Sequence, residues 1–158
     1  MKEEDIRPKK IFDEYLKLTN IDTKTYFGDC DREAVHCPAC KTPGIFSFRK
    51  SDFDYEECPK CLTLFVSPRP IASAFDKYYT EAPSVDYWAT TFYKETADSR
   101  RELLWKPKAK MVKQVINKWL GQKDEYSVVD IGGGYGIFSE EIEILTNTKS
   151  IVIEPGPS

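Results

Sequence analysis

The sequence predicts a chain of mixed α+β and α/β class, in which a small metal-stabilised module precedes helices and the start of a parallel sheet. Three observations predict this. Two Cys-x-x-Cys motifs lie in the first half of the chain, and apolar residues recur at helical spacing through its middle. A glycine-rich turn and a helical pattern then separate two short apolar runs. Strand, helix and strand within about thirty residues predict a βαβ unit with a parallel pair of strands.

These patterns divide the chain into four expected segments. They are a helix with its lead-in (1–29), a four-cysteine module (30–70), a helical connector (71–121) and the start of an α/β domain (122–158). The expected helices are 8–20, 71–79, 86–105, a further one after Pro107, and 138–145. The expected strands are 45–49, 63–66, 126–131 and 150–154.

Composition and charge exclude several classes of function. The 158 residues carry a formal charge of −3 with acids and bases mixed, which gives no reason to expect a nucleic acid or an anionic membrane as partner. No apolar stretch is long enough for a transmembrane helix, and the charged first ten residues contain no secretory signal. We therefore expect a cytoplasmic protein, in which clustered cysteines are metal ligands rather than disulfides.

The cysteine spacing predicts a zinc ribbon. The two motifs are separated by seventeen residues, and each can present both of its thiolates to one ion. The four expected ligands are Cys37, Cys40, Cys58 and Cys61. Four sulfurs satisfy tetrahedral zinc, and the separation suits two metal-binding turns joined by a hairpin. Iron stays open on spacing alone, whereas redox Cys-x-x-Cys motifs usually come singly at a helix start.

The remaining features of this module point to a structural or small-molecule role. Cys30 and His36 are left over, and we expect a surface thiol and a solvated imidazole because four sulfurs already fill the metal site. Between Asp31 and Arg69 six bases and six acids cancel. A module without a basic stripe is not expected to grip nucleic acid.

The glycine-rich turn predicts a nucleotide-like ligand. The expected strand ends at Asp130, and Gly132, Gly134 and Gly136 follow at every second position. Glycines there permit a tight turn and let a ligand lie against bare backbone. The dinucleotide fingerprint fails because it requires Gly or Ala where Ile137 and Ser139 stand, and no Gly-Lys-Ser/Thr follows to make a P-loop.

The Asp-x-Gly-x-Gly-x-Gly pattern of this turn resembles the first motif of class I S-adenosylmethionine (SAM)-dependent methyltransferases. The resemblance implies that the methionine end of SAM is lined by Asp130, Gly132, Gly133, Gly134 and Gly136. In that family an acid at the end of the next strand holds both ribose hydroxyls. Glu154 stands there, 24 positions after Asp130, and its two oxygens match two hydroxyl donors.

The order of parts, from the cysteine pairs through an aromatic-rich connector to the glycine turn, resembles the zinc-containing methyltransferases of nucleotide-sugar and polysaccharide biosynthesis. The resemblance implies an enzyme that uses SAM and Zn²⁺ and methylates a small molecule such as a nucleotide-linked sugar. It leaves the methylated atom open. Two alternatives remain: a zinc-ribbon adaptor with a non-catalytic methyltransferase remnant, and a nucleic-acid methyltransferase.

The length predicts that the Rossmann-like domain is incomplete. The cofactor fold of this family needs six or more strands, and the sequence offers two in its final segment. Two parallel strands with one helix cannot bury both faces of a sheet. We therefore expect the front part of a longer enzyme, inactive by itself, with the catalytic base beyond residue 158. We assign no catalytic residue for that reason.

Overall fold

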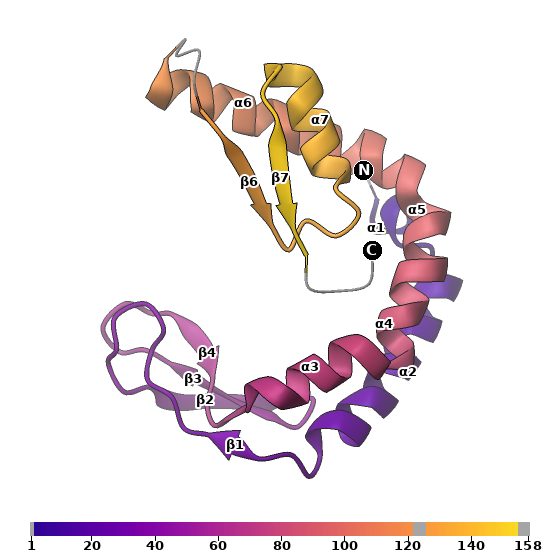
Figure 1. Ribbon diagram of the computed structural model, residues 1–158. Coiled ribbons are helices and arrows are strands. Elements are labelled where there is room, and N and C mark those ends of the chain that lie inside the picture. The colour runs from indigo at the N-terminus through magenta and orange to yellow at the C-terminus, as the bar shows by residue number, and fades with distance from the viewer. Residues whose placement is uncertain (1, 122–125, 155–158) are drawn as a thin grey trace. The chain divides into compact units, whose positions relative to one another are not determined.

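The computed structural model describes residues 2–121 and 126–154, which combine helices with three small sheets, compatible with the α+β class (Figure 1). Residues 122–125 and 155–158, the two ends of the α/β segment expected at 122–158, lie outside the described residues. Packing divides the chain into two compact units. One comprises residues 16–85, and the other joins residues 1–15 to residues 86–158.

The unit of residues 16–85 is built on short antiparallel sheets. Its strands are β1 (Arg32–Glu33), β2 (Ile45–Lys50), β3 (Phe53–Glu57), β4 (Leu64–Val66) and β5 (Arg69–Pro70). In the described part, β2, β3 and β4 form one sheet in that order, and β1 pairs with β5. Helix α3 (Ala72–Glu81) follows the last strand. The predicted strands at 45–49 and 63–66 are thus found, and a third strand lies between them.

A two-residue turn makes the β2–β3 hairpin, whose second strand, β3, was not among the predicted strands. Ser51 and Asp52 both adopt positive φ, of 50° and 63°. Two successive positive φ values are the conformation of the type I′ turn, whose twist matches that of the flanking strands. Arg49 pairs with Asp52 and Asp54 across this turn. Because the usual Asn-Gly or Asp-Gly signal is absent, the pattern alone did not locate this turn.

Helix α2 (Lys9–Phe27) runs seven residues beyond the predicted end at Asn20. Asp22 in this extension is buried, and its Oδ2 accepts the backbone N–H of Ser84 at 2.7 Å. Ser84 lies in the first turn of α4 (Pro83–Tyr87), where N–H groups have no partner within the helix. Asp22 therefore caps α4, which is distant in sequence. This contact comes from the part of α2 beyond the predicted end.

Replacing Asp22 by Ala is expected to lower the free energy of unfolding by about 2 kcal/mol, because it leaves a buried backbone N–H without an acceptor. Asp22→Asn keeps an acceptor oxygen and should cost less. Urea unfolding followed by circular dichroism measures both, with Asp29→Ala, at an exposed aspartate, as the control. An Asp22→Ala midpoint equal to that of the control would contradict the capping role.

The second unit contains a long helical run that passes through Pro107. After α4 come a π-helical segment (Trp88–Phe92), α5 (Tyr93–Arg100), a second π-helical segment (Arg101–Trp105) and α6 (Lys106–Leu120). The sequence predicted separate helices on either side of Pro107. Instead, the N–H of Lys106 donates to the carbonyl of Arg101 five residues back, and Pro107 falls in the first turn of α6. Proline is tolerated in the first turn of a helix because an N–H group at that position has no partner within the helix, so its absence costs no hydrogen bond.

The βαβ pattern at the end of the described chain is confirmed. Strands β6 (Val128–Ile131) and β7 (Ser150–Ile153) pair in parallel, with Val128 opposite Ser150. Helix α7 (Ile137–Thr146) connects them and packs on β7 and α6 (Figure 1). The short helix α1 (Glu3–Ile6) packs against α5 in the same unit.

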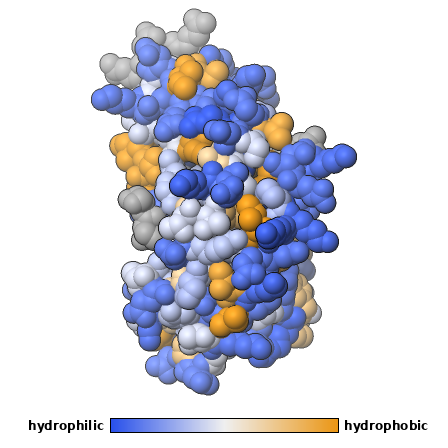
Figure 2. Space-filling view, turned by 90° about the vertical axis from the view of Figure 1, so that its right-hand side faces the viewer, coloured by the Kyte–Doolittle hydropathy of each residue, from blue (hydrophilic) through white to orange (hydrophobic). Residues whose placement is uncertain are grey.

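Apolar side chains stay exposed on the paired strands. They are Val129, Ile131, Ile151, Val152 and Ile153. Figure 2 shows one face of the molecule, on which apolar groups form separate islands among polar ones. None of the described helices combines the length and the apolar character needed to cross a membrane.

Candidate functional sites

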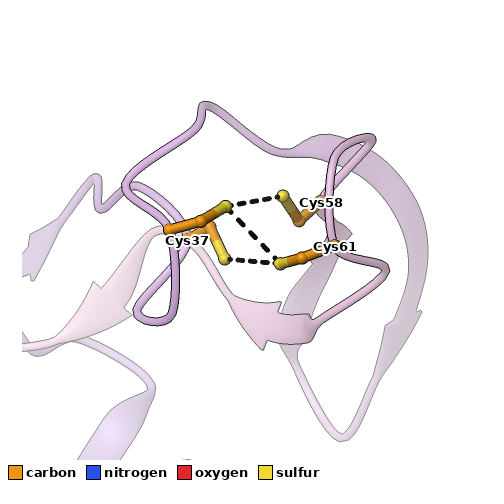
Figure 3. Close-up of side chains that lie close together, drawn as sticks. Cys37, Cys58 and Cys61 are labelled. Atoms are coloured by element: carbon orange, nitrogen blue, oxygen red, sulfur yellow. Dashed lines mark hydrogen bonds between the residues drawn. The ribbon is translucent and has the colours of Figure 1, made fainter.

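The four predicted cysteines come together between the two turns that carry them. Their sulfurs all lie within 4.8 Å of one another. The measured pairs are Cys37–Cys61 at 3.5 Å, Cys40–Cys58 at 3.4 Å and Cys40–Cys61 at 3.5 Å. Figure 3 shows the side chains of the two turns directed toward one another. Four thiolates around a tetrahedral metal would be about 3.8 Å apart, given a metal–sulfur distance near 2.3 Å. These cysteines can therefore hold a metal ion.

The two turns have the same backbone hydrogen bonds. The N–H of Cys37 donates to Thr42 and the N–H of Cys58 donates to Thr63, both at 2.9 Å. The residue after each motif then folds back, because the N–H groups of Lys41 and Leu62 donate to the carbonyls of Cys37 and Cys58. Each turn thereby presents both of its sulfurs on one side, from residues that the sequence places only three positions apart.

Both residues that follow the motifs are left-handed, with φ of 62° for Lys41 and 60° for Leu62. This conformation costs a non-glycine residue about 1–2 kcal/mol. Leu62 is 71 % exposed, so it contributes little packing in return. We expect Leu62→Gly to raise the free energy of unfolding by about 1 kcal/mol in the metal-loaded protein, measured by chemical denaturation. Glycine at exposed Lys60, where φ is not positive, is the matched control and should not stabilise.

The surroundings of the sulfurs favour thiolate at one position and thiol at another. Thr42, whose hydroxyl lies 3.3 Å from Cys40 Sγ, lowers the pKa of Cys40 to about 6. Burial raises the pKa of Cys58 to about 11. Burial acts in the same direction on Cys37, but the N–H groups of Cys40 and Ala39 outweigh it and lower its pKa. Metal binding requires deprotonated sulfur, so a bound cation has to provide the remaining stabilisation at Cys58.

The leftover residues of the module lie outside this cluster. His36 is exposed, as expected of a solvated imidazole. Cys30 is half-buried, with its sulfur 3.5 Å from the carbonyl of Phe27, so it is less exposed than the surface thiol that we predicted.

A pocket of about 740 Å³ lies in the same unit, beside the cysteine turns. A volume of this size suits a small-molecule ligand. Its aromatic and cationic side chains are Phe53, Tyr55, Phe65, Phe75, Lys41 and Arg69, and His36 also lines it. None of the described residues that line it is acidic. Arg69 is held in place by Glu33, whose Oε1 accepts from its Nε at 2.9 Å and from its Nη2 at 2.8 Å.

The predicted cofactor residues gather where β6 and β7 end, around residues 132–136, which we call the glycine loop. The N–H of Gly134 donates to Glu154 Oε2 at 2.8 Å. Ser139 Oγ donates to Asp130 Oδ2 at 3.1 Å, and the N–H of Gly132 donates to the carbonyl of Ile153 at 2.8 Å. In parallel sheets, ligands bind beyond the carboxyl ends of the strands. The structure therefore brings the two acids and the glycine loop to such an end.

The glycine loop leaves backbone open to a ligand at Gly132. This residue has a φ of 74°, and a Cβ placed on it would meet nothing within 4 Å. Gly133 lies close to Asp130 instead, while Gly134 and Gly136 both have positive φ. An exposed stretch of backbone with positive φ is the kind of surface that glycine provides for close approach of a ligand.

Aromatic residues of the helical run lie against the glycine loop, which the sequence did not predict. The Tyr93 ring is 4.6 Å from the Tyr135 ring, and the Tyr135 hydroxyl donates to the carbonyl of Ala89 at 2.9 Å. Arg101 donates to Glu140 and Glu141 of α7 and fixes that helix beside the run. The aromatic density of the connector was the available signal, but spacing alone cannot say which element it contacts.

The fold and site thus define a mixed helix–strand chain with a four-cysteine cluster able to hold a metal ion. Comparison with protein-family models, with curated proteins and with solved structures finds no match.

Proposed function

We propose that this chain is the cofactor-binding front part of a SAM-dependent methyltransferase that carries a zinc ribbon. The observation that carries the proposal is the contact between the Gly134 N–H and the Glu154 carboxylate at the ends of two parallel strands. It places a carboxylate beside a glycine-rich backbone, where a nucleoside with two ribose hydroxyls and an amino-acid end can lie.

The described residues fit this cofactor. Open backbone at Gly132 can accept close approach of the ligand, and Asp130 offers a carboxylate for its ammonium group. SAM supplies the electrophilic methyl group of its sulfonium. The share of this chain is to bind and align the cofactor, so that the nucleophile of the substrate can attack in line.

For the cysteine cluster we propose zinc. Four thiolates at these distances satisfy the tetrahedral coordination of zinc, and two equivalent turns joined by a hairpin form the ribbon arrangement. The role is structural, because four protein ligands leave no open position on the ion.

The pocket beside the cysteine turns supports a nucleotide-linked sugar as substrate. Aromatic rings such as Phe53 and Phe75 can stack on a base, and Lys41 and Arg69 can donate hydrogen bonds to a diphosphate. A lining without an acid suits an anionic ligand better than a cationic one. The balanced charge of the module still gives no support to a nucleic-acid substrate.

Isothermal titration calorimetry with SAM tests the cofactor proposal. We expect binding by the chain and a loss of affinity of about a hundredfold or more in Glu154→Ala, because the carboxylate makes two charge-assisted hydrogen bonds. Glu95→Ala, at an exposed glutamate of α5, is the matched control and should bind as the wild type does. Absence of SAM binding from a folded, metal-loaded chain would overturn the proposal and favour a zinc-ribbon adaptor.

A further inference from the structure

A cage of aromatic rings surrounds Arg100 in the unit that contains the glycine loop. The guanidinium carbon lies 5.8, 5.9, 5.7 and 5.8 Å from the ring centroids of Trp88, Phe92, Tyr93 and Trp105. We call these four residues the aromatic cage. Arg100 is only 8 % exposed. Stacking on aromatic faces stabilises a cation, but it leaves the N–H groups of the guanidinium without acceptors.

Among the described residues, no anion lies beside Arg100, although a buried cation normally has one. Its neighbour Arg101 pairs with both Glu140 and Glu141, whereas no described carboxylate pairs with Arg100. Its Nε is buried and has no hydrogen-bond acceptor within the described chain. Burial lowers the pKa of Arg100, and the nearby charge of Arg7 acts in the same direction. Burying a cation without an anionic partner costs free energy, so an anionic ligand that pairs with Arg100 would remove this cost.

A second buried donor on the cage has no acceptor either. Trp105 Nε1 is buried and unpaired in the described part of the protein. Unpaired buried N–H groups are rare, and the two side-chain cases found in residues 2–121 and 126–154 belong to neighbouring side chains of one cluster. Lys108 adds a further cation, with its Nζ 4.9 Å from the Trp105 ring centroid. Among the described residues the cluster therefore offers two unpaired hydrogen-bond donors and two cations but no carboxylate that pairs with them.

The aromatic cage touches the glycine loop and the helix that follows it. Tyr93 packs on Tyr135 within the loop, and a Cβ on Gly134 would lie 3.7 Å from the Tyr93 hydroxyl. Trp105 packs on Phe138 in the first turn of α7, at 6.4 Å between ring centroids. The two π-helical segments contribute Trp88, Phe92 and Trp105, and such segments are frequent at functional sites.

We propose that Arg100 and Trp105 Nε1 bind the carboxylate of the methionine end of SAM. This inference rests on the proposed function and extends it to a residue pair that no sequence motif indicated. A carboxylate has only acceptors, so it satisfies a guanidinium and an indole N–H together. Asp130 then faces the ammonium group of the same amino-acid end, which gives each charge of the zwitterion an opposite charge on the protein.

A ligand pair that differs only in this carboxylate tests the inference. Calorimetry compares SAM with decarboxylated SAM on the wild type and on Arg100→Met and Trp105→Phe. Methionine fills the cage with a flexible side chain that packs well on aromatic rings, and phenylalanine removes the indole N–H alone. We expect each variant to lose roughly tenfold to a hundredfold in affinity for SAM, as for a hydrogen bond to a charged group, and little for the decarboxylated ligand. Arg101→Lys is the control, and it should alter both affinities equally.

A second readout separates ligand binding from a structural role. The indole N–H resonance of Trp105, assigned through Trp105→Phe among the three tryptophans, should shift downfield with SAM and stay in place with decarboxylated SAM. Wild-type affinities that are equal for the two ligands would overturn the inference while leaving the proposed function intact. Failure of the wild type to bind either ligand would overturn both. If Arg100→Met does not fold, Trp105→Phe and the resonance decide.

Discussion

Removal of the proposed zinc ion is expected to unfold the cysteine turns and the hairpin between them, in the unit of residues 16–85. One buried apolar cluster of this unit consists of Cys37, Cys58 and Phe65, with Val35 and Cys40 packed against them. The ligands and this cluster are thus largely the same residues, and the β2–β3 hairpin that joins the two turns has exposed side chains along β2. The binding free energy of a structural zinc ion is comparable to the whole stability of a small domain. Without it, little buried apolar surface remains to hold the turns together.

The measurement combines chelation with metal analysis. Mass spectrometry of the purified protein should find a single zinc ion per chain, and an excess of chelator should remove it together with the near-ultraviolet circular dichroism of Phe53 and Tyr55. Cys58→Ser should behave like the chelated protein, because a buried hydroxyl is a poor ligand at a thiolate position. Cys30→Ser, which changes the cysteine outside the cluster, is the matched control and should retain the metal.

Two results would contradict this expectation. Iron in place of zinc, with its visible absorption, would retain the cluster but change the identity of the ion. A chelated protein with an unchanged spectrum and melting temperature would mean that the sheet of β2, β3 and β4 is stable by itself, so that the cysteines would have no structural role.

The sequence predicted the four-cysteine cluster well because its determinants are local. Two residues between cysteines fix the geometry of each turn, and four cysteines leave few ways to share one ion. A hairpin between the turns was expected, but its turn and its second strand were not located, because Ser51 and Asp52 adopt a conformation that glycine or asparagine usually signals. Left-handed Lys41 and Leu62 illustrate the same point. Hydrogen bonds within the cysteine turns and between β2 and β3 hold backbone conformations that these residue types do not favour.

The helices of both units were predicted less completely, because their features depend on contacts between distant residues. The extension of α2 includes Asp22, whose partner Ser84 is 62 positions away. The helix continues through Pro107 by way of a π-helical turn, which the spacing of apolar residues does not indicate. Arg100 and Arg101 are adjacent and identical in type, yet one meets two glutamates and the other meets four rings. A pattern can place such residues on a helix, but only packing decides what each one faces.

Replacing Gly133 by Val is expected to disrupt the end of the β6–β7 pair. A Cβ at this position would lie 2.7 Å from Asp130 Oδ2 and 2.9 Å from Val152 Cγ1, closer than such atoms approach one another in proteins. Asp130 would have to move, and its hydrogen bond from Ser139 would be lost. Overpacking of this kind costs about 3 kcal/mol. The expected result is a fall of that size in the free energy of unfolding, measured by urea denaturation, together with loss of SAM binding.

Gly132→Ala is the matched control, because it tests backbone conformation without steric overlap. A Cβ on Gly132 meets nothing within 4 Å, but its φ of 74° costs a non-glycine residue about 1–2 kcal/mol. We therefore expect Gly132→Ala to be less destabilising than Gly133→Val. Equal losses would mean that positive φ, rather than contact with Asp130, accounts for the glycines of this loop. A larger loss at Gly133 would mean instead that the loop holds the carboxylate of Asp130 in position, as a residue facing a ligand ammonium group requires.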